Sequence, residues 1–136
     1  MLTLFTNRYQ EYVPAQGVPV RITLGAPRFR LPYQLKHAVR ELAPRREYFS
    51  KPLPEFTAAY RADLDQLGAA RIAELLHEIA GQEGEHRLVL LCFEDLSDPK
   101  QWCHRTVFAS WWKDVTGDAV RELSPRADQY EQGTLM

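Results

Sequence analysis

The chain has 136 residues, 45% of them hydrophobic, which suffices for one globular domain with a buried core. No apolar run approaches the roughly 20 residues that a membrane-spanning helix needs, and the N-terminus lacks the pattern of a signal peptide. We therefore expect a soluble, cytoplasmic protein without a membrane partner. Two cysteines are too few for a disulfide framework and are expected to be free thiols.

The net charge of −1 is unevenly distributed. Residues 1–51 contain nine Lys and Arg against three acids, a balance of +6, so the remaining residues carry −7. A basic stretch can contact phosphate groups, which makes a nucleic-acid-binding module that uses residues 21–51 one candidate function. The alternative is that the two parts of the chain neutralise each other across the fold.

The first part of the chain favours two strands and a long irregular segment. Residues 2–6 and 18–24 are rich in branched and aromatic side chains and are bounded by Gly, Pro and Asn, so both are predicted strands. Five prolines between residues 26 and 54 oppose a long helix. We expect a loop there, with one short helix near residues 45–49.

The second part is predicted to alternate helices and strands. Apolar residues recur at steps of three and four in two stretches, which indicates helices, while a continuous apolar run indicates a strand covered on both faces. In chain order the predicted elements are helices over 55–67 and 72–79, a strand over 87–93, a helix between the loop 95–100 and Gly117, and a short strand over 119–123. The polar tail, 124–136, is expected to be partly disordered.

This order of elements predicts an α/β fold. We expect a single compact domain over residues 1–123, with a mostly parallel central sheet and helices on both faces. In such folds ligands bind at the carboxyl ends of the strands. The predicted strand over 87–93 and the helix that follows it are therefore where a functional site is sought.

Two short motifs bring reactive side chains to this edge of the predicted sheet. Cys92 and Glu94 end the strand, and because strand side chains alternate, both point to one face. Cys103, His104 and Arg105 open the next helix, where unpaired N–H groups and the helix dipole favour an anion. We expect this position to lower the pKa of the Cys103 thiol, which would then be partly ionised near neutral pH.

These residue types suggest distinct chemical roles. Cys103 is the candidate nucleophile or redox centre, His104 the proton donor and Glu94 the residue that orients them. Arg105, together with an arginine of the basic segment such as Arg28, is predicted to bind an anionic small molecule or nucleotide. The resulting hypothesis is a ligand pocket at the helix start, with a thiol-dependent enzyme as its more specific form.

Simpler interpretations stay open at these positions. Cys103 shares a helical face with Val107 and can be a small core residue, so a structural or interaction protein is a further alternative. Cys92, Glu94 and the Cys103–His104 pair include metal-binding side chains, but neither Cys-x-x-Cys nor His-x-x-x-His occurs, and no metal or cofactor is predicted. Motifs for dinucleotides, nucleoside triphosphates and ester hydrolysis are also missing.

Several motifs of the chain resemble those of domain-of-unknown-function family 488, a group of bacterial and phage proteins. The motifs are Leu-Leu-Cys-Phe-Glu at 90–94, Trp-Cys-His-Arg at 102–105, Val-Arg-Glu-Leu at 120–123 and Ala-Pro-Arg-Phe at 26–29. The resemblance covers about residues 18–123.

This resemblance implies a compact α/β domain whose shared polar side chains form a ligand pocket. The implied site residues are Cys92, Glu94, Cys103, His104 and Arg105. Pro27 and Arg28 are implied as wall residues of the pocket. The resemblance implies no particular reaction.

Overall fold

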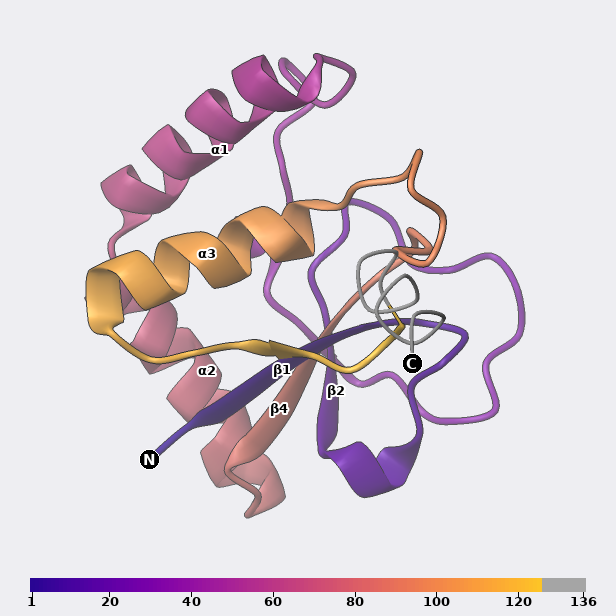
Figure 1. The fold of residues 1–136 in the computed structure, drawn as a ribbon. Coiled ribbons are helices and arrows are strands. Elements are labelled where there is room, and N and C mark those ends of the chain that lie inside the picture. Colours follow the sequence, from indigo (N-terminus) through magenta and orange to yellow (C-terminus); the bar gives the residue numbers. More distant parts are fainter. Residues whose placement is uncertain (126–136) are drawn as a thin grey trace, which may run out of the picture.

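The computed structural model describes residues 1–125, which form a five-stranded parallel sheet in the order β3-β2-β4-β1-β5 and three α-helices (Figure 1). The strands are β1 (Thr3–Arg8), β2 (Val18–Arg21), β3 (His37–Ala38), β4 (Arg87–Cys92) and β5 (Arg121–Glu122). The helices are α1 (Leu53–Leu67), α2 (Ala69–Glu83) and α3 (His104–Thr116). The predicted α/β class and parallel sheet are confirmed. Within residues 1–125, no helix has the length and apolarity needed to cross a membrane.

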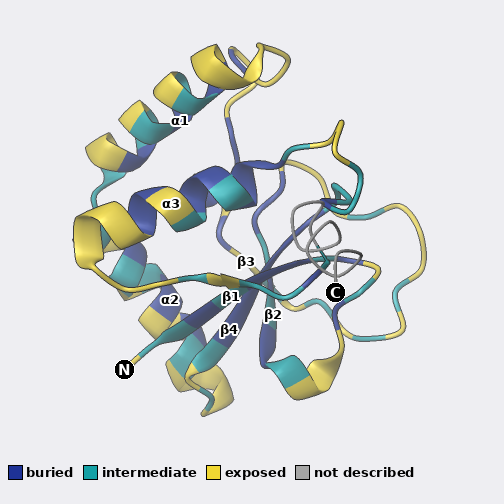
Figure 2. Ribbon diagram, in the orientation of Figure 1, coloured by how far each residue is buried: buried dark blue, intermediate teal, exposed yellow. Residues whose placement is uncertain are grey.

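β4 occupies the centre of the sheet. It pairs with β1 on one side and with β2 on the other, so that Leu88 lies opposite both Leu4 and Val18. Every residue of β4 after Arg87 is buried (Figure 2). The apolar run in the sequence follows from this position, because a strand covered on both faces offers no place for a solvated side chain.

All three helices pack on one face of the sheet, whereas the sequence predicts helices on both faces. Their buried side chains form one core with strand residues such as Leu4, Val20 and Leu90. The reason is topological, since the connections from β3 to β4 and from β4 to β5 cross the sheet in the same direction. Right-handed crossovers that run in one direction place their helices on one face.

The opposite face is covered by connections that contain no α-helix. The links from β1 to β2 and from β2 to β3 run the other way across the sheet, so they cover the face that the helices leave free. A second, smaller core forms there around Val89 and Leu91 of β4. The linking segments contribute Tyr9, Tyr12, Leu31, Tyr33 and Leu35 to it.

Gly17 allows the link between β1 and β2 to lie directly against β4. Its φ is +140°, and a Cβ built there would lie 2.6 Å from the Arg87 carbonyl oxygen. Only glycine fits such a close approach in this backbone conformation. The one-turn 3-10 helix before it, Pro14–Gln16, is thereby held at the amino end of the central strand.

Several predicted boundaries differ from the structure. The strand predicted over 18–24 ends at Arg21, and residues 46–50 form turns in place of the short helix predicted near 45–49. β3 was not predicted, because its two residues lie within the segment 26–54, whose five prolines favour a loop. The predicted disorder of the tail concerns residues that, from 126 onward, lie outside the described part of the chain.

Candidate functional site

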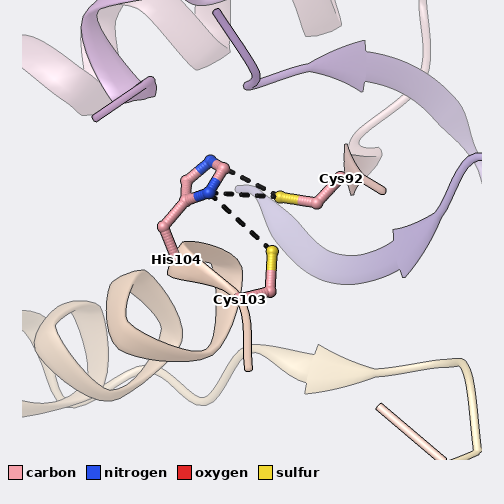
Figure 3. Close-up of side chains that lie close together, drawn as sticks. All are labelled: Cys92, Cys103 and His104. Carbon is pink, nitrogen blue, oxygen red and sulfur yellow. Dashed lines mark hydrogen bonds between the residues drawn. The ribbon is translucent and has the colours of Figure 1, made fainter. Parts of the chain in front are cut away.

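Cys92, Cys103 and His104 come together at the carboxyl edge of the sheet (Figure 3). Cys92 is the last residue of β4, Cys103 is the N-cap of α3 and His104 is the first residue of that helix. Their two sulfurs and a ring nitrogen lie within 4.8 Å of one another, and the residues are only 0%, 2% and 6% exposed. The structure thus brings three of the predicted site residues into one buried cluster.

This cluster lies at the carboxyl ends of the neighbouring strands β2 and β4, from which the chain continues in opposite directions across the sheet. The chain leaves β2 toward β3 on one side and leaves β4 toward β5 on the other. His104 lies between the two strand ends, with its ring next to the Ile22 carbonyl that follows β2 and the Cys92 sulfur that ends β4. In open α/β sheets the crevice at such a switch point is the usual ligand position.

The hydrogen bonds of His104 assign its tautomer. Nε2 lies 2.6 Å from the Ile22 carbonyl oxygen, and because a carbonyl only accepts, Nε2 carries the proton in the neutral ring. Nδ1 then has a free lone pair, at 3.6 Å from Cys92 Sγ and 3.8 Å from Cys103 Sγ. This nitrogen can take a proton from the Cys103 thiol, whereas Cys92 Sγ lies nearer to Nε2, at 3.4 Å.

Burial dominates the protonation of Cys103. Loss of solvation raises the pKa of its thiol well above the usual value, because the thiolate would lose its contact with water. The predicted lowering of this pKa is therefore wrong, since desolvation outweighs the effect of the helix N-terminus. Burial also acts to lower the pKa of His104, but the neighbouring Cys103 sulfur and the Ile22 carbonyl outweigh it, and the net shift is upward.

Arg105 points into the protein and is held by an ion pair. Its side chain is 0% exposed, and Nε and Nη2 donate to the Glu122 carboxylate at 2.9 and 3.2 Å. Nη2 also donates to the Glu94 carbonyl oxygen at 3.1 Å, while Nη1 has no partner within residues 1–125. Glu122 therefore occupies the Nε–Nη2 edge, one of the two edges of the guanidinium that can bind an anion with two parallel hydrogen bonds.

Glu122 is a structural partner that the sequence analysis missed. Besides Arg105, it accepts hydrogen bonds from the Thr6 hydroxyl at 2.7 Å and from the Ser124 hydroxyl. Burial acts to raise the pKa of Glu122, but the hydrogen bond and charge of Arg105 outweigh it and lower the pKa. An acid within a predicted strand, and within the Val-Arg-Glu-Leu motif, was the signal that could have identified it.

Two cavities border the cluster, and Cys103 lines both. The smaller, about 140 Å³, also contains Glu94, His104 and the half-exposed Phe49. The larger, about 590 Å³, lies between α1 and α3 and includes Trp102 and the partly exposed Leu53. Exposed side chains line each cavity, although Cys103 itself is only 2% exposed. Cys92 lines neither cavity.

Pro27 and Arg28 lie apart from these cavities. Both belong to the link between β2 and β3, where Arg28 is exposed and Pro27 is half-buried. The adjacent Phe29 contacts Phe93, a residue of the smaller core on the sheet face opposite to Cys92. The structure therefore does not bring these two predicted wall residues to the cluster.

Comparisons of the chain with protein-family models, curated proteins and solved structures gave no match. The resemblance to family 488 therefore stays a prediction.

Proposed function

We propose that the chain is a thiol-dependent enzyme that binds a small molecule next to Cys103. One observation carries the proposal: Cys103 lines both cavities while its Sγ lies 3.8 Å from His104 Nδ1. An activated cysteine needs a base within reach and a third group that orients the base. The Ile22 carbonyl is that third group, because its bond to Nε2 keeps the lone pair on Nδ1.

In this proposal the thiol and imidazole exchange one proton. As Sγ attacks an electrophilic carbon of the bound molecule, His104 takes the thiol proton at Nδ1 and then gives it to the leaving group. Glu94 lines the smaller cavity together with Cys103 and His104, and in this proposal it positions the bound molecule against these two residues. Cys92, beneath the ring and away from both cavities, is not the nucleophile.

The geometry gives less support to the anionic ligand or nucleotide predicted from the sequence. Arg105 is paired with Glu122, and Glu94 brings a carboxylate to the smaller cavity. We therefore define the substrate by its electrophilic carbon rather than by a phosphate or carboxylate group.

The nucleic-acid alternative also has weaker support. Lys36 and His37 of the basic segment lie 3.3 and 2.7 Å from Glu83, and Arg45 lies 3.0 Å from Asp63. Acids of the second part of the chain thus neutralise part of this segment, which reduces the charge left for phosphate groups.

Alkylation of the folded protein with iodoacetamide tests the thiol proposal. Mass spectrometry should find Cys103 labelled before Cys92, and His104→Gln should slow the labelling of Cys103 by about 10²-fold, the lower range of general-base effects. His77→Gln is the matched control, because His77 is exposed on α2, away from the cluster. Equal labelling of the two cysteines, or labelling that starts only in denaturant, would rule out Cys103 as the nucleophile.

A further inference from the structure

The two sulfur-to-nitrogen distances in the cluster are close to those between ligands of a tetrahedral metal ion. Zinc bonds of about 2.3 Å to sulfur and about 2.0–2.1 Å to nitrogen separate a sulfur from a nitrogen ligand by roughly 3.6 Å and two sulfurs by roughly 3.8 Å. His104 Nδ1 lies 3.6 Å from Cys92 Sγ and 3.8 Å from Cys103 Sγ, and all three atoms lie within 4.8 Å. The sulfur-to-sulfur distance, at most 4.8 Å, would have to shorten by up to about 1 Å around one ion.

The hydrogen bonding of His104 is also that of a metal ligand. A histidine that binds a metal usually donates its other ring N–H to a carbonyl or carboxylate, which fixes the tautomer and the ring orientation. Here Nε2 donates to the Ile22 carbonyl oxygen, which leaves the lone pair on Nδ1, 3.8 Å from Cys103 Sγ and 3.6 Å from Cys92 Sγ. Cys92 Sγ lies slightly nearer to Nε2, at 3.4 Å, so its side chain must shift toward Nδ1 to share one ion. Two thiolates and an imidazole are a donor set that suits zinc.

Charge balance favours an ion at this buried position. A thiolate alone is costly here because it lacks solvation, but two thiolates and one Zn²⁺ sum to zero charge. We propose that Cys92 Sγ, Cys103 Sγ and His104 Nδ1 bind one zinc ion. Within residues 1–125 the group of possible ligand atoms contains no fourth member, so water from the adjacent cavity of about 140 Å³ completes the coordination.

Zinc binding itself does not require the thiol reaction. Its effect on reactivity, described next, rests on the proposed function. A Cys103 sulfur bound to zinc is not free to attack a substrate, so the ion would switch off the nucleophile. Zinc occupancy and alkylation of Cys103 are then mutually exclusive.

Cobalt titration of the reduced, metal-free full chain tests the site. One equivalent of Co²⁺ should give thiolate-to-cobalt absorption and the intense visible bands of tetrahedral coordination, and Zn²⁺ should displace it. Cys92→Ser and Cys103→Ser should each weaken binding by more than the about 10- to 100-fold that loss of an outer-shell partner costs. His77→Gln should bind as the natural chain does, and circular dichroism checks the fold of each variant.

The natural chain alone can refute the site, so a variant that fails to fold does not obscure the result. A spectrum without thiolate character, or less than one equivalent bound, overturns the proposal. Alkylation with and without one equivalent of Zn²⁺ separates the two proposals. If zinc binds but metal-free Cys103 is unreactive, the thiol reaction fails and the zinc site stands; if Cys103 reacts equally in both samples, the zinc site fails.

Discussion

Replacing Glu122 with Gln removes one buried negative charge while hardly changing the size of the side chain. Arg105 and Glu122 have side chains that are 0% and 6% exposed, so the guanidinium would keep its charge without water or a counter-charge. Breaking a buried ion pair by removing one partner costs about 3–5 kcal/mol of folding stability. The predicted effect of Glu122→Gln is a loss in this range.

The hydrogen bonds of the pair lead to a similar magnitude. Both carboxylate oxygens accept from Arg105, at 2.9 and 3.2 Å, and the amide that replaces one oxygen can no longer accept there. The Thr6 and Ser124 hydroxyls also donate to this carboxylate. Each carboxylate oxygen accepts one hydrogen bond from Arg105 and one from a hydroxyl, so the amide nitrogen that replaces one oxygen loses two. Each hydrogen bond to a charged group contributes about 1.5–3 kcal/mol, so losing two of them gives about 3–6 kcal/mol.

Urea unfolding of the full chain measures the loss. Asp114→Asn is the matched control, because it makes the same carboxylate-to-amide change in the Arg61–Asp114 pair, at 2.8 Å but with side chains 32% and 64% exposed. That surface pair should contribute only about 0–1 kcal/mol. A loss below about 1 kcal/mol for Glu122→Gln, or one no larger than in the control, would refute the reasoning.

Two further predictions concern acid and glycine. Because the pKa of Glu122 is below its usual value of 4.5 in the folded protein, the unfolded chain binds the proton first as pH falls, so stability should decrease from about pH 5 downward. As pH falls over this range, the urea midpoint of unfolding should decrease less in Glu122→Gln than in the natural chain. An equal decrease in both proteins would contradict the lowered pKa of Glu122. Gly17→Ala should cost about 1–3 kcal/mol through its clash with Arg87, whereas Gly81→Ala, in open space within α2, should gain roughly 0.5–1 kcal/mol. Thermal unfolding compares the two, and the reverse order of stability would be inconsistent with the structure.

The sequence revealed those parts of the fold that depend on local patterns. Apolar residues at steps of four and three predicted α1, and the continuous apolar run predicted β4, because each element covers enough residues to show its pattern. The face on which the helices pack depends on strand order, which arises from contacts between distant segments. For this reason no local pattern in the sequence could show that the helices pack on one face of the sheet, and the prediction of helices on both faces was wrong.

The same limit applies to the site. Cys92 and Cys103 were expected to meet because a strand end and the next helix start share one edge of a parallel sheet. The partner of Arg105 comes instead from β5, 17 residues further along the chain, and no local pattern connects the two. The direction of the Cys103 pKa shift was mispredicted because it depends on burial, which is a property of the assembled core.

The bond from His104 to the Ile22 carbonyl ties the imidazole of the cluster to the main chain directly after β2. The proposed ligand next to Cys103 therefore meets a His104 ring with fixed orientation, while the outer walls are formed by Phe49 and Trp102 in the smaller cavity and by Leu53 and Trp102 in the larger one. Substitutions at these walls should change which molecules are admitted while leaving the reactive atoms in place. Under the proposed function, substrate selection and chemistry can then vary separately in this fold.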